Sequence, residues 1–213
     1  MTGCDENCCK GDKCISLETK IEVYDQNYNE WNSDKRSQNQ RFLHIASDVA
    51  SDSTCLRRHV GAVITFEGRS TSSGYNGSPS GTYNCKEIKT CRKEREGFTP
   101  NDYTKIAGVS HGDDICVAVH AEINSIINAN GVGDTIYIIN KICREGNTIY
   151  ESSKPCLKCS GGILNTKRWV GGGIKKIVYL NNDMTIGVMT RDDLINAINQ
   201  QMDKMYSNNT PSE

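Results

Sequence analysis

The chain has 213 residues, 11 cysteines and a formal net charge of −1, which suits one domain of ordinary size with an irregular extension. A charge this close to zero gives no global field that would recruit nucleic acid or an anionic membrane. No apolar run is long enough to cross a bilayer and no signal peptide opens the sequence, so we expect a cytoplasmic protein whose cysteines bind metal rather than form disulfides.

Residues 1–30 are expected to form a poorly ordered extension, because small and polar residues dominate them. Four cysteines lie in this segment: Cys4, Cys8, Cys9 and Cys14. They could form an accessory metal site, but no histidine or second C-x-x-C completes one, so we favour a flexible tail. The folded domain is then expected over residues 31–206, followed by a frayed end at residues 207–213.

The first regular element is a helix that starts at Gln38 and ends at Asp52. Its apolar residues fall three or four apart and would form one buried face. They are Phe42, Ile45, Ala46, Val49 and Ala50. A strand over residues 60–66, a tight turn at Glu67-Gly68 and a returning strand over residues 69–73 predict an antiparallel hairpin.

A loop rich in glycine and serine follows the hairpin at residues 74–81, and we do not expect regular structure there. Its glycines permit positive φ and a close approach of the backbone to a ligand. An ordinary surface loop would have the same composition. The position just after a sheet edge favours a substrate or effector loop instead.

Residues 86–114 are charged and poor in apolar side chains, and we interpret them as an insertion with a short helix over residues 88–96. Insertions of this length are uncommon unless they are functional or held in place, and a metal could hold this one. A final helix is predicted over residues 190–205, capped by Thr190 or Asp192. Its inward residues would be Leu194, Ile195, Ile198 and Met202.

Between these segments, a helical pattern after His120 leads into a strand over residues 135–139. A second helical stretch after Cys156 leads into a strand over residues 176–180. The order helix, strand, helix, strand predicts an α/β protein and brings two helix N-termini to one edge of a sheet. Residues at the start of the two helices can therefore converge.

The residues at these two helix starts predict a catalytic metal site. His120, Cys156 and Cys159 offer one imidazole and two thiolates, and three protein ligands leave the fourth position of a tetrahedral zinc for water. Glu122 lies beside the metal without needing to bind it, where a carboxylate can move protons between water and substrate. H-x-E alone is common, and C-x-x-C alone could be a structural zinc site or a redox pair. Together, in this order, they are the signature of zinc-dependent nucleobase deaminases.

Further motifs follow the order seen in the deoxycytidylate (dCMP) deaminases. They are Ser53-Thr54-Cys55-Leu56-Arg57, Val60-Gly61-Ala62-Val63-Ile64, Gly74-Tyr75-Asn76-Gly77, His120-Ala121-Glu122, Pro155-Cys156-Leu157-Lys158-Cys159 and Gly173-Ile174-Lys175-Lys176-Ile177-Val178-Tyr179. Over residues 31–179 the chain closely resembles that family. The resemblance implies a three-layer α/β/α cytidine-deaminase-like fold with a central mixed β-sheet, and a catalytic domain over residues 31–206.

The resemblance also implies an activity, the hydrolytic deamination of dCMP to dUMP, which supplies dTTP synthesis. Glu122 would be the catalytic residue, taking a proton from water activated by zinc, passing it to N3 of cytosine and helping ammonia leave. The Ala121 N–H would hold the pyrimidine carbonyl, Asn76 the sugar edge and Arg57 the 5′-phosphate. Lys154, before the Pro-Cys turn, departs from the small, acidic or aromatic residue usual in the superfamily.

A second, structural zinc is implied by the same resemblance. Cys55 and Cys85 stand at the matching places, and His111 fits a third ligand. For the fourth ligand we choose Cys91, with Cys116 as the alternative. Such ligands would tether the irregular insertion, which lacks apolar contacts of its own.

Regulation is implied at the loop formed by Gly74, Tyr75, Asn76 and Gly77, with dCTP as activator and dTTP as inhibitor. A triphosphate effector would bring Mg²⁺ with it. The resemblance further implies a homo-oligomer, a hexamer.

Three alternative functions remain open. The same chemistry could act on another cytosine compound, such as cytidine, dCTP or a modified deoxycytidylate. A nucleic-acid deaminase would need a basic channel with stacking aromatic residues, which the charge balance and the 7% aromatic content disfavour. A non-catalytic zinc module would have no use for Glu122.

Overall fold

The computed structural model describes residues 33–97, 116–144 and 147–207. The predictions made for the extension at residues 1–30, for His111 and for most of the insertion lie outside these ranges, and the domain boundaries stay predictions. None of the helices in the described ranges is both long and apolar enough to span a membrane.

The centre of the molecule is a mixed sheet, with six strands in the described residues. They are β1 (His59–Phe66), β2 (Arg69–Tyr75), β3 (Thr135–Arg144), β4 (Asn147–Glu151), β5 (Lys176–Leu180) and β6 (Ile186–Thr190). The strand order is β2-β1-β3-β5-β6, with β4 paired to the end of β3. Strands β3 and β5 are parallel, and the other neighbours are antiparallel.

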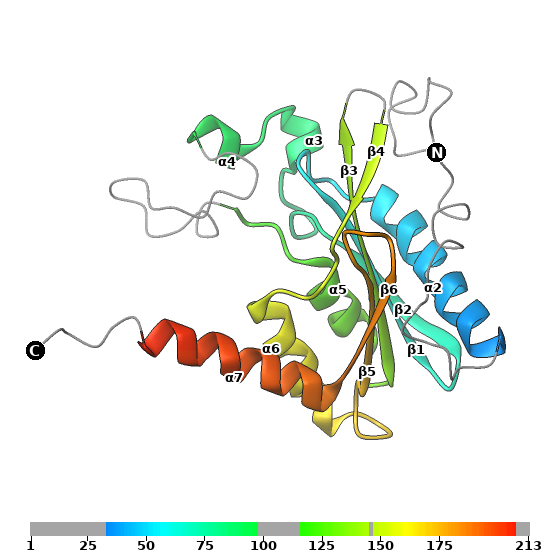
Figure 1. The fold of residues 1–213 in the computed structure, drawn as a ribbon. Helices are drawn as coiled ribbons and strands as arrows, with labels where there is room; N and C mark the ends of the chain where they lie inside the picture. Colours follow the sequence, from blue (N-terminus) through cyan, green and yellow to red (C-terminus); the bar gives the residue numbers. More distant parts are fainter. Residues whose placement is uncertain (1–32, 98–115, 145–146, 208–213) are drawn as a thin grey trace, which may run out of the picture.

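Helices cover both faces of this sheet (Figure 1). Helix α2 (Ser33–Ser51) lies on one face, and α5 (Ala121–Asn128), α6 (Leu157–Asn165) and α7 (Arg191–Ser207) lie on the other. The 3₁₀ turn η2 (Thr166–Arg168) follows α6. Two short helices, α3 (Cys85–Ile88) and α4 (Arg92–Arg95), lie apart from these layers. The predicted three-layer α/β/α fold is confirmed.

Each face of the sheet has its own apolar core, because strand side chains alternate between the two faces. Under α2, the ring centroids of Phe42 and Tyr137 lie 5.0 Å apart, and Val63 and Ile139 belong to the same buried cluster. On the other face, Ile136 and Ile138 of β3 pack with residues of α5 and α6. Burial of both faces explains the nearly unbroken apolar runs in β1 and β3.

The predicted hairpin, the first helix and β5 are confirmed, and the hairpin turn places Glu67 and Gly68 at φ 49° and 74°. Strands β4 and β6 were not predicted, and β2 continues through Gly74 and Tyr75, where we expected a loop to begin. The short helix expected over residues 88–96 is present but shorter, as α4, and α3 was not predicted.

The last helix is confirmed and so is its Thr190 cap, which exchanges hydrogen bonds with Asp193. Leu194 is buried, but Ile195 is 37% exposed, so its predicted inward position is wrong. Helix α7 therefore presents a narrower apolar face than its sequence indicated.

Helix α2 approaches β1 closely at Gly61, where a methyl group would meet the backbone carbonyl of Ala46 and lie 2.6 Å from the backbone N of Ala50. We expect Gly61→Ala to lower the free energy of unfolding by at least about 2 kcal/mol, because the clash is with backbone. Gly161→Ala is the matched control, because an added methyl meets no atom within 4 Å. It should change stability by less than about 1 kcal/mol. Urea titration of both variants measures the difference, and equal midpoints would contradict the packing described.

Candidate active site

Two helix N-termini supply the metal-ligating side chains. His120 is the N-cap of α5 and Cys156 is the N-cap of α6; both have extended backbone dihedrals, and neither side chain caps its helix. The side chains are therefore free to point away from their helices. Cys159, three residues after Cys156, lies in the first turn of α6 and is fully buried.

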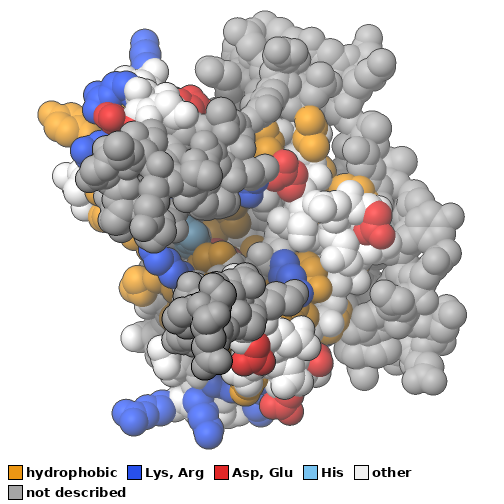
Figure 2. Space-filling model, turned by 60° about the vertical axis from the view of Figure 1, so that its left-hand side comes forward, with side chains coloured by type: hydrophobic (Ala, Val, Ile, Leu, Met, Phe, Trp, Pro, Cys, Tyr) orange, Lys and Arg blue, Asp and Glu red, His pale blue; other side chains and the backbone are white. Residues whose placement is uncertain are grey.

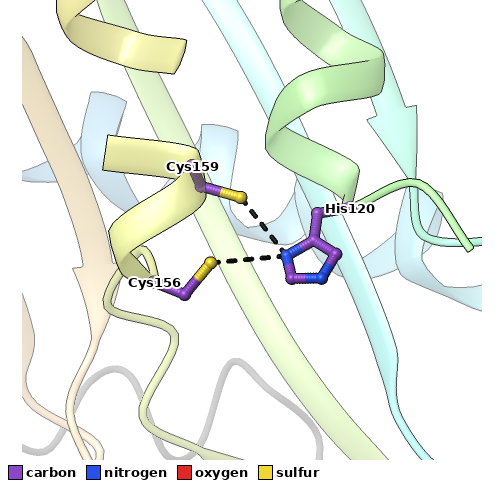
Figure 3. Close-up of side chains that lie close together, drawn as sticks. All are labelled: His120, Cys156 and Cys159. Atoms are coloured by element: carbon purple, nitrogen blue, oxygen red, sulfur yellow. Dashed lines mark hydrogen bonds between the residues drawn. The ribbon is translucent and has the colours of Figure 1, made fainter. Parts of the chain in front are cut away.

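The three side chains converge between the helices (Figure 3). The Nδ1 atom of His120 lies 3.4 Å from Cys156 Sγ and 3.3 Å from Cys159 Sγ. Among the described residues, these form the group whose ligand atoms all lie within 4.8 Å of one another. One imidazole nitrogen and two sulfurs suit Zn²⁺ in both chemistry and spacing.

The pKa values of the two cysteines indicate that this group would bind a cation. A hydrogen bond from Cys159 lowers the pKa of the Cys156 thiol to about 4, and the His120 ring adds to this effect. The same bond raises the pKa of Cys159. One thiolate is thus stabilised by one thiol, and a divalent cation would stabilise both as thiolates.

Glu122 lies in the first turn of α5, two residues after His120, and is 5% exposed. Burial raises the pKa of its carboxyl group, and the neighbouring Cys156 raises it further. A carboxyl with a raised pKa is suited to accept and return protons near neutral pH. Ala121 is the first residue of α5, so its backbone N–H has no acceptor within the helix.

A cavity of about 680 Å³ opens at this point. His120, Ala121, Glu122, Asn76 and Arg57 all line it, so the structure brings the predicted catalytic and substrate-binding residues to one place. Figure 2 shows the face of the molecule that is hollowed here, with a histidine visible in the hollow and Lys and Arg side chains near it.

The predicted effector loop is bound directly to the segment that carries the metal ligand. Gly77 and Val119 exchange two backbone hydrogen bonds, of 3.2 and 2.8 Å. The side chain of Asn124 on α5 donates to the carbonyl of Tyr75 at 2.7 Å. Gly74 is needed for this approach, because a methyl group there would lie 2.7 Å from the Ala121 carbonyl. No motif in the sequence marks Val119 or Asn124 as partners of this loop.

The side chain of Asn76 supports the loop from within. Its Oδ1 accepts hydrogen bonds from Ser53 Oγ at 2.7 Å and from the Val60 backbone at 2.8 Å, and its Nδ2 donates to the Arg58 carbonyl at 3.0 Å. One N–H of the amide is left for a ligand. Arg57 is mostly buried, and its Nε lies 3.9 Å from the carboxylate of Glu94.

The cysteines predicted for a second metal lie together as a looser group. Cys55, Cys85, Cys91 and Cys116 line the same cavity. Burial, together with the other three thiols, raises the pKa of Cys85 to about 11. Cys55 accepts a hydrogen bond from the backbone N–H of Arg57 at 3.4 Å. Cys91 and Cys116, the two candidates for the fourth ligand, thus both lie near Cys55 and Cys85, whereas His111 lies outside the described residues.

The fold and the His120-Cys156-Cys159 group define a zinc site of the nucleobase-deaminase class. The family model of the cytidine and deoxycytidylate deaminase zinc-binding region matches residues 36–180. This match covers more than half of the chain. The protein therefore belongs to this family, which confirms the resemblance seen in its motifs.

Three relatives illustrate the range of the family. The deoxycytidylate deaminase of Mycobacterium phage D29 is 35% identical over 138 residues, which cover 65% of this chain and 90% of that protein. The deoxycytidylate deaminase of Enterobacteria phage T2 is 35% identical over 161 residues, covering 64% and 76%. That of Saccharomyces cerevisiae is 32% identical over 140 residues, covering 65% of this chain and 36% of the yeast protein.

Proposed function

We propose that this protein catalyses the hydrolytic deamination of dCMP to dUMP and ammonia. The observation that carries the proposal is the meeting of His120, Cys156 and Cys159 at a cavity with a buried carboxylate, Glu122, beside them. Relatives named deoxycytidylate deaminase support the choice of substrate. The product would supply dTTP synthesis.

The chemistry needs a water molecule that attacks C4 of cytosine and an amino group that leaves as ammonia. Zinc held by the three ligands would act as a Lewis acid that lowers the pKa of a water molecule towards neutrality. Glu122 accepts the proton that the water gives up and delivers it to N3 of the ring. It then moves a second proton to the departing nitrogen, so that the water oxygen becomes O4 of dUMP.

The remaining contacts orient the nucleotide. The Ala121 N–H, free of an intrahelical acceptor, donates to the pyrimidine carbonyl. The free N–H of Asn76 donates to a sugar oxygen. Arg57 lines the cavity and contributes positive charge for the phosphate, although Glu94 shares its guanidinium.

Glu122→Gln should lower kcat by about 10²- to 10⁴-fold, because the amide keeps the shape of the side chain but cannot accept a proton. Zinc per chain should not change, since Glu122 is not among the ligands. The assay measures ammonia release and counts zinc per chain in the same sample. The compounds offered are dCMP, dCTP, cytidine, deoxycytidine and single-stranded DNA, so the assay tests both the role of Glu122 and the choice of substrate.

Glu67→Gln, a change of the same kind at an exposed glutamate, serves as the control and should retain full activity. If Glu122→Gln kept its turnover, the proton-transfer mechanism would be wrong. If single-stranded DNA or cytidine were the better substrate, the choice of dCMP would be wrong and the chemistry would stand.

A second, structural zinc is also proposed, held by cysteines between α3, α4 and the segments before β1 and α5. Cys55, Cys85 and Cys91 are common to both possible ligand sets. The proximity of Cys116 to these three supports Cys116 as the remaining ligand, in the place that the sequence analysis assigned to His111. Four thiolates are a common set for structural zinc, and the ion would tether short helices that have no buried apolar face beyond Cys91.

Cys85→Ser should lower the zinc content from about two ions per chain to about one, with a lower midpoint of thermal unfolding. Cys116→Ser should do the same, whereas His111→Ala should not. Tyr83→Ser, at a residue 84% exposed in the same segment, is the control and should retain both ions. Elemental analysis by mass spectrometry provides the count. Loss of zinc in His111→Ala but not in Cys116→Ser would restore the ligand set predicted from the sequence.

Allosteric control by dCTP and dTTP, with Mg²⁺ accompanying the triphosphate, is proposed at Gly74, Tyr75, Asn76 and Gly77. The hydrogen bonds from this loop to Val119 and Asn124 support the proposal, because a ligand that moves the loop also moves the helix that carries Glu122. A hexameric assembly would link the loops of several subunits.

Saturation by dCMP should be sigmoidal and should become hyperbolic when dCTP and Mg²⁺ are added, with dTTP acting in the opposite direction. Tyr75→Ala should weaken the response to dCTP more than it changes kcat, because the side chain is partly exposed on the loop. Initial rates measure the kinetic response to the triphosphates, and sedimentation velocity measures the size of the assembly. Curves that neither triphosphate alters would rule out this form of regulation.

A further inference from the structure

The charged side chains that line the cavity are mostly basic. Within residues 33–97, 116–144 and 147–207, five cations, Arg57, Arg58, Lys93, Lys154 and Lys158, line it together with one carboxylate, Glu122. A cavity with this excess of positive charge favours a ligand that carries negative charge away from its reacting end. In a nucleoside monophosphate that charge lies on the 5′-phosphate.

Both arginines already face carboxylates. Arg58 Nη2 lies 3.1 Å from Glu151 Oε2, and Arg57 Nε lies 3.9 Å from Glu94 Oε1. A phosphate bound by either guanidinium would have to share it with an existing partner. The arginines are therefore less suited than their charge alone indicates.

Lys154 differs from them in two ways. It is exposed and lines the cavity, and its ammonium has no carboxylate within 4.0 Å among the described residues. Its main chain is held in place, because the preceding Ser153 is buried and hydrogen-bonded to strands β3 and β5. Ser153 N donates to the Leu180 carbonyl at 2.9 Å, and its Oγ donates to the Ile138 carbonyl at 2.7 Å.

The residue after Lys154 is also fixed, since Pro155 is buried and leads directly into the metal ligand Cys156. A free cation thus extends into the cavity from a rigid turn two residues from the metal site. A lysine ammonium on a flexible stem binds phosphate as a point charge.

We propose that the ammonium of Lys154 binds the 5′-phosphate of the substrate and gives the site its preference for a nucleoside monophosphate over the nucleoside. The proposal rests on the deaminase function proposed above and names a residue that selects its substrate. Lys154 acts on binding of the phosphate and takes no part in proton transfer at the base.

The test compares substrates with and without the phosphate. Lys154→Ala should lower kcat/KM for dCMP by about 10- to 100-fold, mainly through KM, because a charge-assisted hydrogen bond is lost. The value for deoxycytidine should change less than about twofold. Lys154→Arg should recover most of the activity on dCMP, since it restores the charge. Lys167→Ala, an exposed lysine on η2 outside the cavity lining, is the control.

Calorimetry with dUMP and deoxyuridine separates this proposal from the deaminase function, because it needs no turnover. Lys154→Ala should weaken the binding of dUMP and leave that of deoxyuridine unchanged. An equal loss of affinity for dUMP and for deoxyuridine would show that Lys154 only shapes the Cys156 turn. An unchanged affinity for dUMP would mean that the phosphate binds elsewhere. Lys154-dependent binding of dUMP without dCMP turnover would overturn the proposed function alone.

Discussion

The parallel pairing of β3 with β5 is the constraint on which the site depends. Four residue pairs, from Thr135–Lys176 to Ile138–Tyr179, fix these strands side by side. Helix α5 precedes β3 and α6 precedes β5, and both helices lie on the same face of the sheet. Their N-termini are therefore neighbours, and ligands far apart in the sequence meet. The helices pack closely, since a methyl group on Gly162 of α6 would lie 2.6 Å from Ile123 Cδ1 of α5.

This arrangement also sets the electrostatics of the site. Two helix N-termini supply partial positive charge to a place that collects Cys156, Cys159 and Glu122. Without a cation, burial raises the pKa of the Glu122 carboxyl, the hydrogen bond with Cys156 raises the pKa of the Cys159 thiol, and the negative charges of the neighbouring groups add to both effects. A bound divalent cation removes this conflict, so the same geometry that assembles the ligands also selects for metal.

The sequence predicted those parts of the site in which the functional residues belong to one short motif. A C-x-x-C on one helix start and an H-x-E on another are short motifs, and their geometry follows from where helices begin. The strands β4 and β6 escaped prediction because each has only five residues, although each pairs with the strand directly before it in the chain. Ile195 was misplaced because periodicity does not show how wide a helix contact is. The choice between Cys91 and Cys116 as a ligand of the second zinc depends on tertiary positions that spacing alone does not give.

The loop at Gly74–Gly77 illustrates a second limit. Its composition indicated a ligand-binding loop, yet most of its contacts are within the fold. Three of the four hydrogen-bonding positions of the Asn76 amide are used by Ser53, Val60 and Arg58. A ligand can therefore receive only one hydrogen bond from this side chain, and it must offer an acceptor. The loop thus contributes mainly by position, since it forms one wall of the cavity and is tied to α5. Because the loop is hydrogen-bonded to α5 and to the segment before it, we expect a shift of the loop to change the distance between substrate and Glu122 rather than remove a single contact.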